Sequence, residues 1–532
     1  MASVARDRPA AGDVRGGPPA WAGLPEGVER QRRRVVSVVL DVARLALVAL
    51  VGGLAQRLSG HAAGPSLAAL EVEVRDALLR LGVALLGEVV RLRGTGYRGP
   101  SYVCPCGVRL VLKELAPLQQ RTWFGPITLE RAVYAGAGCR VRAHRVPLDA
   151  AWGLLGATPP PALPDPDGGV LLPAPPGGGP ARLAPAFAAL VVEFGARLPY
   201  AEAARLLEAA LGPVARLAPN TIRAYTQAAG RARREAEAAA LADRRRLTRG
   251  ELRALSGRGT PPRPPAAPDV LAVALDGALE RTRAGWKEVK LGAVWDLRPA
   301  RARPAAGGAP PAPALVPGAT TYTATLAPAA AFGRQLRAAA QRRGLGWARR
   351  VTVLGDGAKW IWALATRRFP GAAQTVDWYH AREHLWALAQ LLYGEGTPAA
   401  WAWLETVAGE LWLAATPADV AVVALAAADA WTAPAPPGAP RRTKARRLEA
   451  AKAIAYFAAN APRMCYAARR AEGLPVGSGV VEGGCHSVLH VRLKRPGARW
   501  ALAAADNMVC ARALLCSDPA PACGHPADRL AA

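Results

Sequence analysis

Three carboxylates in this sequence have the type and the setting to hold divalent cations. Asp276 and Asp356 each end an apolar run and precede a glycine, and Glu482 falls in the first turns of a helix expected after a Gly-Ser-Gly segment. Carboxylate oxygens are hard ligands suited to Mg²⁺ or Mn²⁺, and such ions promote phosphodiester chemistry. The pattern therefore predicts that Asp276, Asp356 and Glu482 meet at one point of a sheet and form a metal-dependent phosphodiester site.

Each of these carboxylates has a structural alternative. Asp-Gly is a turn signal, and Asp276 fits a turn because a second strand is expected to follow it. Asp356 fits a turn less well, since a helix is expected next. Glu482 could cap its helix by reaching back to Gly479, although a capping box from Ser478 would require Glu or Gln at position 481.

A histidine pair lies after the expected fifth strand. His380 and His384 are one helical turn apart, and the five residues 380–384, His-Ala-Arg-Glu-His, fit the inverted zinc-protease motif H-x-x-E-H. That motif needs a further ligand, which nothing in the sequence supplies. We therefore favour a different role for Asp377, His380 and His384, as hydrogen-bonding groups that orient the carboxylate site.

The elements that must position these residues alternate in type after residue 269. Apolar runs predict strands at 270–275, 289–295, 320–326 and 351–354, and a strand ending at 375–376. Helical periodicity predicts helices at 331–343, 360–368, throughout 384–470, at 479–493 and at 500–516. Three strands that could form a meander, followed by alternating helix and strand, predict an α/β layered fold with a mixed sheet.

Positive charge points to a polyanionic partner. The chain has 68 Lys+Arg against 40 Asp+Glu, a formal net charge of +28, and a charge of this size favours nucleic acid. Arginine enrichment by GC-rich coding is the alternative. Residues 182–235 add a helix-turn-helix pattern, in which a helix over 200–211 ends at a Gly-Pro pair and a second helix opens at Pro219 and runs through Arg231. Arg223 and Arg231 on this second helix are candidate DNA contacts.

The sequence shows no membrane signal. The most apolar stretch, residues 35–55, is interrupted by Asp41 and Arg44, and its uninterrupted part is shorter than the roughly 20 residues that span a bilayer. The N-terminus lacks the apolar core of a signal peptide. We expect a cytoplasmic, nucleoid-associated protein with no membrane partner.

Four ordered motifs resemble the ISKra-type transposases of bacterial insertion sequences. The resemblance covers about residues 98–516. Its motifs are Val-Ala-Leu-Asp-Gly at 273–277 with Gly-Trp-Lys-Glu-Val-Lys at 285–290, Val-Leu-Gly-Asp-Gly-Ala at 353–358 with Trp-Ile-Trp at 360–362, Asp-Trp-Tyr-His at 377–380 with Glu-His-Leu-Trp at 383–386, and Leu-Pro-Val-Gly-Ser-Gly-Val-Val-Glu at 474–482, closed by Arg-Leu-Lys at 492–494 and Arg-Trp at 499–500.

The resemblance implies a DNA transposase with a ribonuclease H-like core, related to Mutator-type transposases, whose Asp-x-x-His motif Asp377 and His380 match. It makes Asp276, Asp356 and Glu482 the catalytic triad, holding two Mg²⁺ or Mn²⁺ ions about 4 Å apart. The implied partners are double-stranded DNA, as transposon ends and target, and further copies of the chain in a homo-oligomer. Arg492, Lys494 and Arg499 are the implied DNA contacts in the closing motifs.

The sequence departs from the family in two places. After Glu482 the family usually has a small residue, a Cys and a Lys, whereas this chain has two glycines, Cys485 and His486, and each glycine weakens a helix by roughly 1 kcal/mol relative to Ala. A catalytically inactive, decayed transposase that only binds DNA is therefore an alternative function, and a metal-dependent nuclease is another.

The second departure concerns the Cys-bearing module that the family has in its N-terminal half. A zinc ribbon needs paired ligands at both of its turns, but Cys139 has no second cysteine nearby. The possible zinc ligands are Cys104, Cys106, Cys139 and His144. We expect little or no bound zinc.

Together these patterns predict a multidomain α/β protein in which helical and small β-rich modules precede a ribonuclease H-like mixed sheet with a large all-helical insertion. The predicted segments are a disordered basic N-terminus (1–34), a helical segment (35–97), a Cys-bearing β module resembling a degenerate zinc ribbon (98–150), a Pro/Gly linker (151–181), a helix-turn-helix-like DNA-binding segment (182–235), a charged helix and Pro-rich hinge (236–268), the first part of the core (269–383), the helical insertion (384–475), the last core helices with Glu482 (476–516) and a tail (517–532).

Overall fold

We describe the protein in a computed structural model. The described residues are 37, 40–41, 43–45, 47–49, 51–53, 55–56, 66–139, 141–152, 183–245, 267–299, 315–435 and 437–518. The predicted basic N-terminus, most of the Pro/Gly linker and of the Pro-rich hinge, and the tail after residue 518 lie outside them.

The chain divides into two compact units. From residue 66 onward, unit 1 holds the described parts of 66–152, 183–187 and 208–215, and unit 2 holds 188–207 and the described residues from 216 to 518. Together they make a mixed α/β protein with two sheets among the described residues, one antiparallel and one mixed. The predicted segment 182–235 is thus shared between the units rather than forming one of its own.

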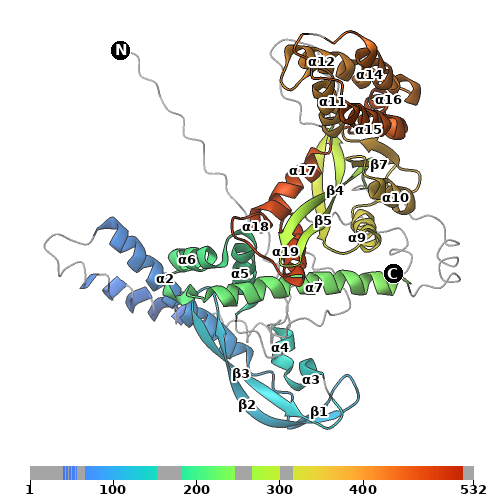
Figure 1. The fold of residues 1–532 in the computed structure, drawn as a ribbon. Helices are drawn as coiled ribbons and strands as arrows, with labels where there is room; N and C mark the ends of the chain where they lie inside the picture. Colours follow the sequence, from blue (N-terminus) through green and yellow to red (C-terminus); the bar gives the residue numbers. More distant parts are fainter. Residues whose placement is uncertain are drawn as a thin grey trace, which may run out of the picture. The chain divides into compact units, whose positions relative to one another are not determined.

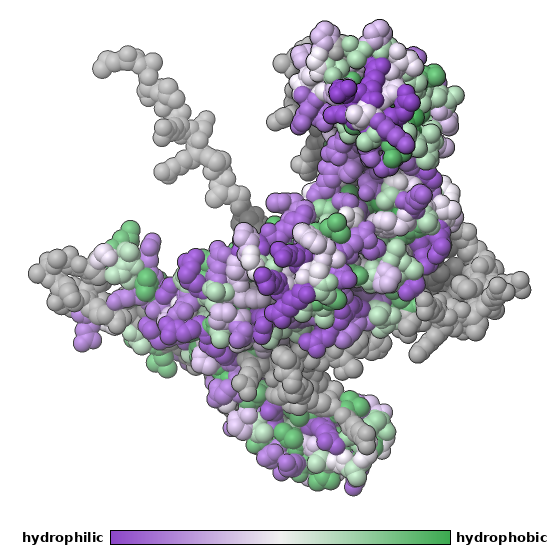
Figure 2. All heavy atoms as spheres, viewed as in Figure 1, coloured by the Kyte–Doolittle hydropathy of each residue, from purple (hydrophilic) through white to green (hydrophobic). Residues whose placement is uncertain are grey.

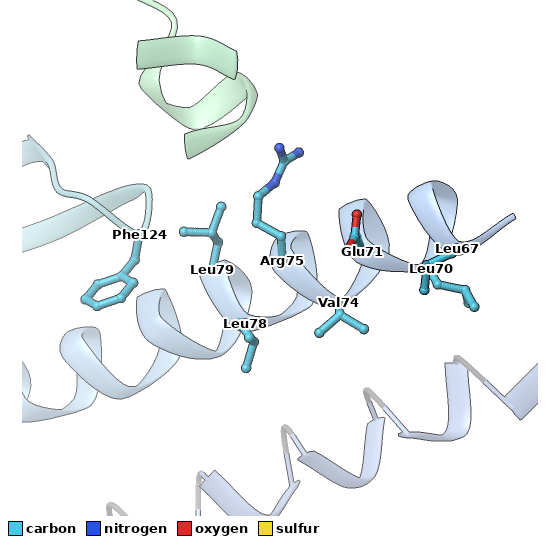
Figure 3. A pocket seen from close by; sticks show the side chains of 8 residues that line it. All are labelled: Leu67, Leu70, Glu71, Val74, Arg75, Leu78, Leu79 and Phe124. Carbon is cyan, nitrogen blue, oxygen red and sulfur yellow. The ribbon is translucent and has the colours of Figure 1, made fainter. Parts of the chain in front are cut away.

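Unit 1 combines a long helix with a small antiparallel sheet of order β1-β2-β3 (Figure 1). Its elements are α2 (Leu67–Arg93), β1 (Ser101–Val103), β2 (Arg109–Arg121), β3 (Pro126–Ala135), α3 (Arg142–Arg145) and α4 (Pro147–Ala151). Ser66 caps α2 by accepting from the backbone N–H of Ala69. Leu70, Val74 and Leu78 project from one side of α2 (Figure 3), and the latter two stay at least 41% exposed.

Three helices and a short 3₁₀ turn connect the sheets in sequence: α5 (Pro185–Arg197), α6 (Tyr200–Leu211), the 3₁₀ turn Pro213–Ala215 and α7 (Pro219–Arg245). The helix over 200–211 and its end at Gly212 are as predicted. The prediction of a second helix ending near Arg231 is wrong, because α7 continues unbroken to Arg245. Its middle packs so closely on the C-terminal helix of the same unit that a Cβ on Gly230 would clash with the carbonyl oxygen of Asn507.

Unit 2 is built on a five-stranded sheet of order β6-β5-β4-β7-β8. Its strands are β4 (Val270–Thr282), β5 (Gly285–Pro299), β6 (Leu315–Thr325), β7 (Arg350–Gly355) and β8 (Ala373–Val376). β4, β5 and β6 form the expected antiparallel meander, while β7 and β8 run parallel to β4. Because both faces of the central strands are covered, β4 begins as a continuous apolar run.

Helices cover both faces of this sheet. Alternate residues of β4 divide between two cores: Leu271, Val273 and Leu275 pack in one with α9 (Ala329–Arg342) and α10 (Lys359–Arg368). Ala272 and Ala274 pack in the other with the C-terminal helices. These are α17 (Gly479–Gly484), a π-helical turn (Cys485–His490), α18 (Val491–Leu493) and α19 (Leu502–Leu515).

The insertion between β8 and α17 is helical, as predicted. It comprises α11 (Trp378–Tyr393), α12 (Pro398–Leu413), α13 (Pro417–Val420), α14 (Val422–Thr432), α15 (Lys444–Asn460), the 3₁₀ turn Ala461–Arg463 and α16 (Tyr466–Ala471). These helices gather at one end of the sheet (Figure 1). On the face shown in Figure 2, hydrophilic and hydrophobic residues are interspersed. Within the described part of the chain, no helix is long and apolar enough to cross a membrane.

Candidate active site

The two predicted aspartates lie at the same edge of the sheet. β4 and β7 are parallel neighbours, with Ala274 opposite Leu354, so Asp276 and Asp356 are each two residues beyond a paired position. The structural alternative of a turn at Asp276-Gly277 does not hold, because β4 continues to Thr282 and pairs Asp276 with Leu291 of β5. Asp276 is therefore paired with β5 on one side. On its other side, β4 has already passed the end of its pairing with β7.

Asp276 faces the C-terminal helices. It shares the side of β4 that carries Ala272 and Ala274, and its Oδ2 accepts a hydrogen bond from the Cys485 thiol at 3.0 Å. Its Oδ1 accepts from the backbone N–H of Gly277 at 2.7 Å. The thiol is buried beside this carboxylate, and burial and the Asp276 charge raise the pKa of Cys485. Cys485 is thus a neutral donor that fixes the Asp276 rotamer.

Asp356 is held by the helical insertion. The Tyr456 hydroxyl of α15 donates to its backbone carbonyl at 2.8 Å, and the Asp356 carboxylate accepts from the N–H of Ala358 at 2.8 Å. Gly357 has φ +101°, and a Cβ there would lie 2.5 Å from the Tyr456 ring, so only glycine fits. His384 stacks on the same tyrosine, with its ring centroid 3.9 Å from that of Tyr456.

Asp377 joins three elements of the site. It is fully buried at the N-cap of α11, where its Oδ1 accepts from the backbone N–H of His380 at 2.9 Å. Its Oδ2 accepts from the backbone N–H of Ser478, which lies at the start of α17. The N–H of Asp377 itself donates to the carbonyl of Gly355 at 2.9 Å. One carboxylate therefore ties the end of β7, the start of α11 and the helix that carries Glu482.

Glu482 lies beside the Asp-x-x-His motif. Asp377, His380 and Glu482 have ligand atoms that all lie within 4.8 Å of one another, with His380 Nδ1 3.3 Å from Asp377 Oδ1 and 4.0 Å from Glu482 Oε1. Asp276, Asp356 and Glu482 do not by themselves form such a group, and their meeting at one point stays a prediction. Like charges oppose a closer approach of carboxylates.

The electrostatics nevertheless link all of these groups. The pKa of His380 is raised to about 9, first by its hydrogen bond to Asp377, with Asp356 among the charges that contribute. Burial raises the pKa of Glu482, and Asp377 and Asp276 raise it further. Asp276 and Asp377 thus act on Glu482, and Asp377 and Asp356 act on His380; such a gathering of carboxylates favours bound cations.

The capping alternative for Glu482 is not supported by the geometry. The helix begins after Ser478, whose side chain makes no capping bond, and its hydroxyl instead donates to Glu482 Oε1 at 3.4 Å. The Glu482 side chain is 43% exposed. Two other carboxylates of the sheet are paired elsewhere, Glu288 with Lys290 at 2.7 Å and Asp296 with Arg298 at 2.5 Å.

The H-x-x-E-H motif does not form a zinc site in the structure. The His384 ring stacks on Tyr456, and Glu383 and His384 do not join any group of possible metal ligands among the described residues. Of the two glycines after Glu482, Gly484 has a structural reason: a Cβ there would lie 2.5 Å from the Tyr322 ring, whereas Gly483 has open space around it. Gly484 therefore allows α17 to pack on the sheet.

The predicted DNA contacts differ in accessibility. Arg223, Arg231, Lys494 and Arg499 are exposed. Arg492 is 4% exposed, and its guanidinium lies over the Tyr200 and Trp500 rings at 4.8 and 5.5 Å. The prediction that Arg492 contacts DNA is wrong for this reason: cation–π packing buries the side chain. It instead holds the segment that presents Lys494 and Arg499.

A second cluster lies in the small sheet of unit 1. Cys104, Cys106, Cys139 and His144 offer ligand atoms within 4.8 Å of one another. Cys104 Sγ is 3.9 Å from Cys139 Sγ, and Cys139 Sγ is 3.5 Å from His144 Nδ1. A tetrahedral zinc site has edges of about 3.8 Å between sulfurs and about 3.6 Å from sulfur to nitrogen. The donor set and its spacing fit zinc.

Sequence reasoning missed the residues that support the site. Tyr456, Cys485 and Ser478 all contact predicted site residues, yet the sequence patterns predict no role there for any of them. A tyrosine in a long helical insertion carries no local signal that it will meet Asp356. Cys485, three residues after Glu482, stands out in the sequence only as part of a motif. No protein-family model and no curated protein matches this sequence.

Proposed function

We propose that the protein is a DNA transposase of the ISKra type, which binds the ends of its element and cuts and joins DNA there. The proposal rests on Asp276, Asp356, Glu482 and the Asp-x-x-His motif, which gather around one edge of a mixed sheet. The strand order β6-β5-β4-β7-β8, with its antiparallel meander followed by parallel strands, supports a ribonuclease H-like core. Nucleoid association follows from DNA binding in this proposal.

The roles of the chain's residues follow from their contacts. Asp276, Asp356 and Glu482 would hold Mg²⁺ or Mn²⁺, whose charge activates the attacking oxygen and stabilises the leaving one. Cys485 and Tyr456 orient the two aspartates. Asp377 fixes the start of α17 and, with His380, sets the position of Glu482. No side chain here is placed as a covalent nucleophile.

The test is strand cleavage of cloned element ends with Mg²⁺ or Mn²⁺. Asp276→Asn, Asp356→Asn and Glu482→Gln each remove one negative ligand without changing side-chain shape. Each should lower the cleavage rate by roughly 10²- to 10³-fold or more, the scale for removing one group that stabilises a transition state, while end binding persists. Glu288→Gln and Asp296→Asn are matched controls, because those carboxylates are paired elsewhere on their own strand.

Other outcomes select other functions. End binding without cleavage by the wild type would favour a decayed transposase that acts only as a DNA-binding protein. Cleavage of any DNA without regard to element ends would favour a metal-dependent nuclease. Near-full cleavage by one of the three variants would remove that residue from the site.

We also propose that the small sheet binds one structural zinc ion through Cys104, Cys106, Cys139 and His144. This reverses the expectation of little or no zinc, which assumed that Cys139 lacks a partner. The distances supply that partner in His144. Positive φ values at Gly107 and Gly138, 83° and 90°, form the tight turns that bring both cysteine segments together.

A further inference from the structure

The outer half of the β4–β5 hairpin extends beyond the rest of the sheet. β7 pairs with β4 only as far as Ala274, whereas β5 pairs with it as far as Thr282. The turn is firmly built, since the Thr282 hydroxyl donates to the carbonyl of Gly285 at 2.7 Å and accepts from the N–H of Ala284 at 3.2 Å. The hairpin therefore presents a fixed tip near the carboxylate site.

This tip exposes an indole among cations. Trp286 is 65% exposed and lies directly opposite Arg281, so the two side chains share one face of the ribbon. Arg283 and Lys287 flank them and are exposed. Within the described residues, the side chains of Arg281, Arg283 and Lys287 have no hydrogen-bonding or ion-pair partner. Two acids lie near the tip on the same hairpin: Glu288 is paired with Lys290, and Glu280, which lies opposite Lys287 on the other face of the ribbon, is buried 3.7 Å from His490.

A second basic segment is fastened to the same tip. The N–H of Arg283 donates to the carbonyl of Trp500 at 2.8 Å, and Thr282 and Trp500 form a β-bridge. This brings the segment 494–500, with exposed Lys494 and Arg499, beside the hairpin end. Arg495 in the same segment is 3.8 Å from Glu202 and so is partly neutralised. The tip and this segment make one cationic surface with an aromatic ring at its edge.

We propose that this surface binds DNA at unpaired nucleotides, with Trp286 stacking on an exposed base and the surrounding Arg and Lys side chains holding phosphates. Proteins bind single-stranded nucleic acid through exposed aromatic side chains among basic residues. DNA suits this surface better than a protein partner does, because a protein surface would offer the cations no phosphates to pair with. The inference rests on the proposed function for its biological setting.

The geometry also sets where the contact falls. Six residues of strand separate Asp276 from Thr282, which is about 20 Å at about 3.3 Å per residue. Nucleotides rise about 3.4 Å each along one strand. Along the hairpin the tip therefore lies about six nucleotide spacings from the carboxylate site, and Trp286 and Asp276 project from opposite faces of the ribbon, because side chains alternate along a strand.

The test is equilibrium binding of the full chain to two DNA probes, a duplex with a short central unpaired loop and the same duplex fully paired. Trp286→Ala should weaken binding to the looped probe by roughly 5- to 150-fold, the range for one base stacked on one ring. Trp286→Phe should keep most of this affinity, and Leu279→Ala, which removes a 60% exposed apolar side chain from the same face, should change little.

Salt dependence separates stacking from charge. Trp286→Ala should leave the slope of log affinity against log salt unchanged, whereas Arg283→Gln should reduce it by about 0.7 to 0.9. Equal binding of the looped probe by wild type and Trp286→Ala would overturn the inference and leave the proposed function standing. An altered oligomeric state of Trp286→Ala without a change in DNA affinity would overturn it too. Failure of the wild type to bind any DNA would remove the proposed function as well.

Discussion

Among single residues, Asp377 contributes more to the site than its place outside the triad suggests. Its carboxylate is fully buried, and a buried charge is costly unless hydrogen bonds satisfy it. Burial raises the pKa of Asp377, but hydrogen bonds from His380 and Ser478 outweigh this and leave the pKa lowered. The ion pair with His380 thus fixes the start of α17 and, through it, Glu482.

The Asp377–His380 pair makes stability depend on pH in a defined direction. The pKa of His380 is about 9 in the folded protein against about 6.5 in an unfolded chain. Its contribution to the free energy of unfolding is complete below about pH 6.5 and is lost as the pH rises through 9. Asp377, with a lowered pKa, contributes above its unfolded value and loses this only in acid.

We therefore expect His380→Gln to destabilise the metal-free protein more at pH 6 than at pH 9.5. Thermal unfolding midpoints of the wild type and the variant in a chelating buffer measure this difference, on a scale of roughly 2–4 °C for each kcal/mol in a protein unit of this size. Glu410→Gln, at an exposed position on α12, serves as the control for a change of charge alone. A difference between wild type and His380→Gln that does not vary with pH would contradict the assignment.

At the level of elements, periodicity located the strands of unit 2 well but misjudged where two elements end. The apolar run of β4 stops at Leu275 because both faces are buried only that far, and the strand then continues to Thr282 as a two-stranded ribbon with alternating exposure. Asp276-Gly277 resembled a turn for that reason. Likewise, α7 continues past Arg231 because its buried face packs on α19, a contact that no local pattern reports.

Only the charged residues of the candidate site could be predicted from the sequence. Spacing and motif placed Asp276, Asp356, Glu482, Asp377 and His380 close together. The partners that hold them are distant in sequence. Tyr456 follows Asp356 by a hundred residues, and Cys485, the first residue of the π-helical turn, lies far along the chain from Asp276. Such contacts depend on tertiary packing, which local propensity does not encode.

Zinc binding by the cysteine cluster is also a question of how elements are held together, because one ion would link three separate turns and helices around the small sheet. The purified protein should carry about one equivalent of zinc under reducing conditions, and Cys106→Ser should release it. Metal analysis of both proteins checks this, with Cys516→Ser as a control outside the cluster. Absence of zinc from the wild type, or equal zinc in Cys106→Ser, would show that the four residues do not form a zinc site.

For the molecule as a whole, the net charge of +28 does not by itself say where DNA is read. Many arginines in unit 2 are already paired, including Arg233 with Glu237 and Arg234 with Asp506. Deleting residues 1–235 to locate the DNA-reading segment would cut α7 in half and uncover its contact with α19. Substitution of exposed arginines therefore tests the predicted role of residues 182–235 more cleanly.

We expect Arg223→Gln combined with Arg231→Gln to weaken binding to element ends and to lower the salt slope by about 1.8, at about 0.9 for each phosphate that is no longer neutralised. Both side chains are exposed on α7, so removing them should cost little stability. The matched control is Arg367→Gln with Arg447→Gln, which removes the same charge from exposed positions on α10 and α15. Gel-shift titrations over a range of salt, with element ends and unrelated duplex, measure both effects. If the control pair weakens end-specific binding as much as the α7 pair does, α7 is not the reader; if it weakens binding more, the helical insertion that carries Arg447 becomes the better candidate.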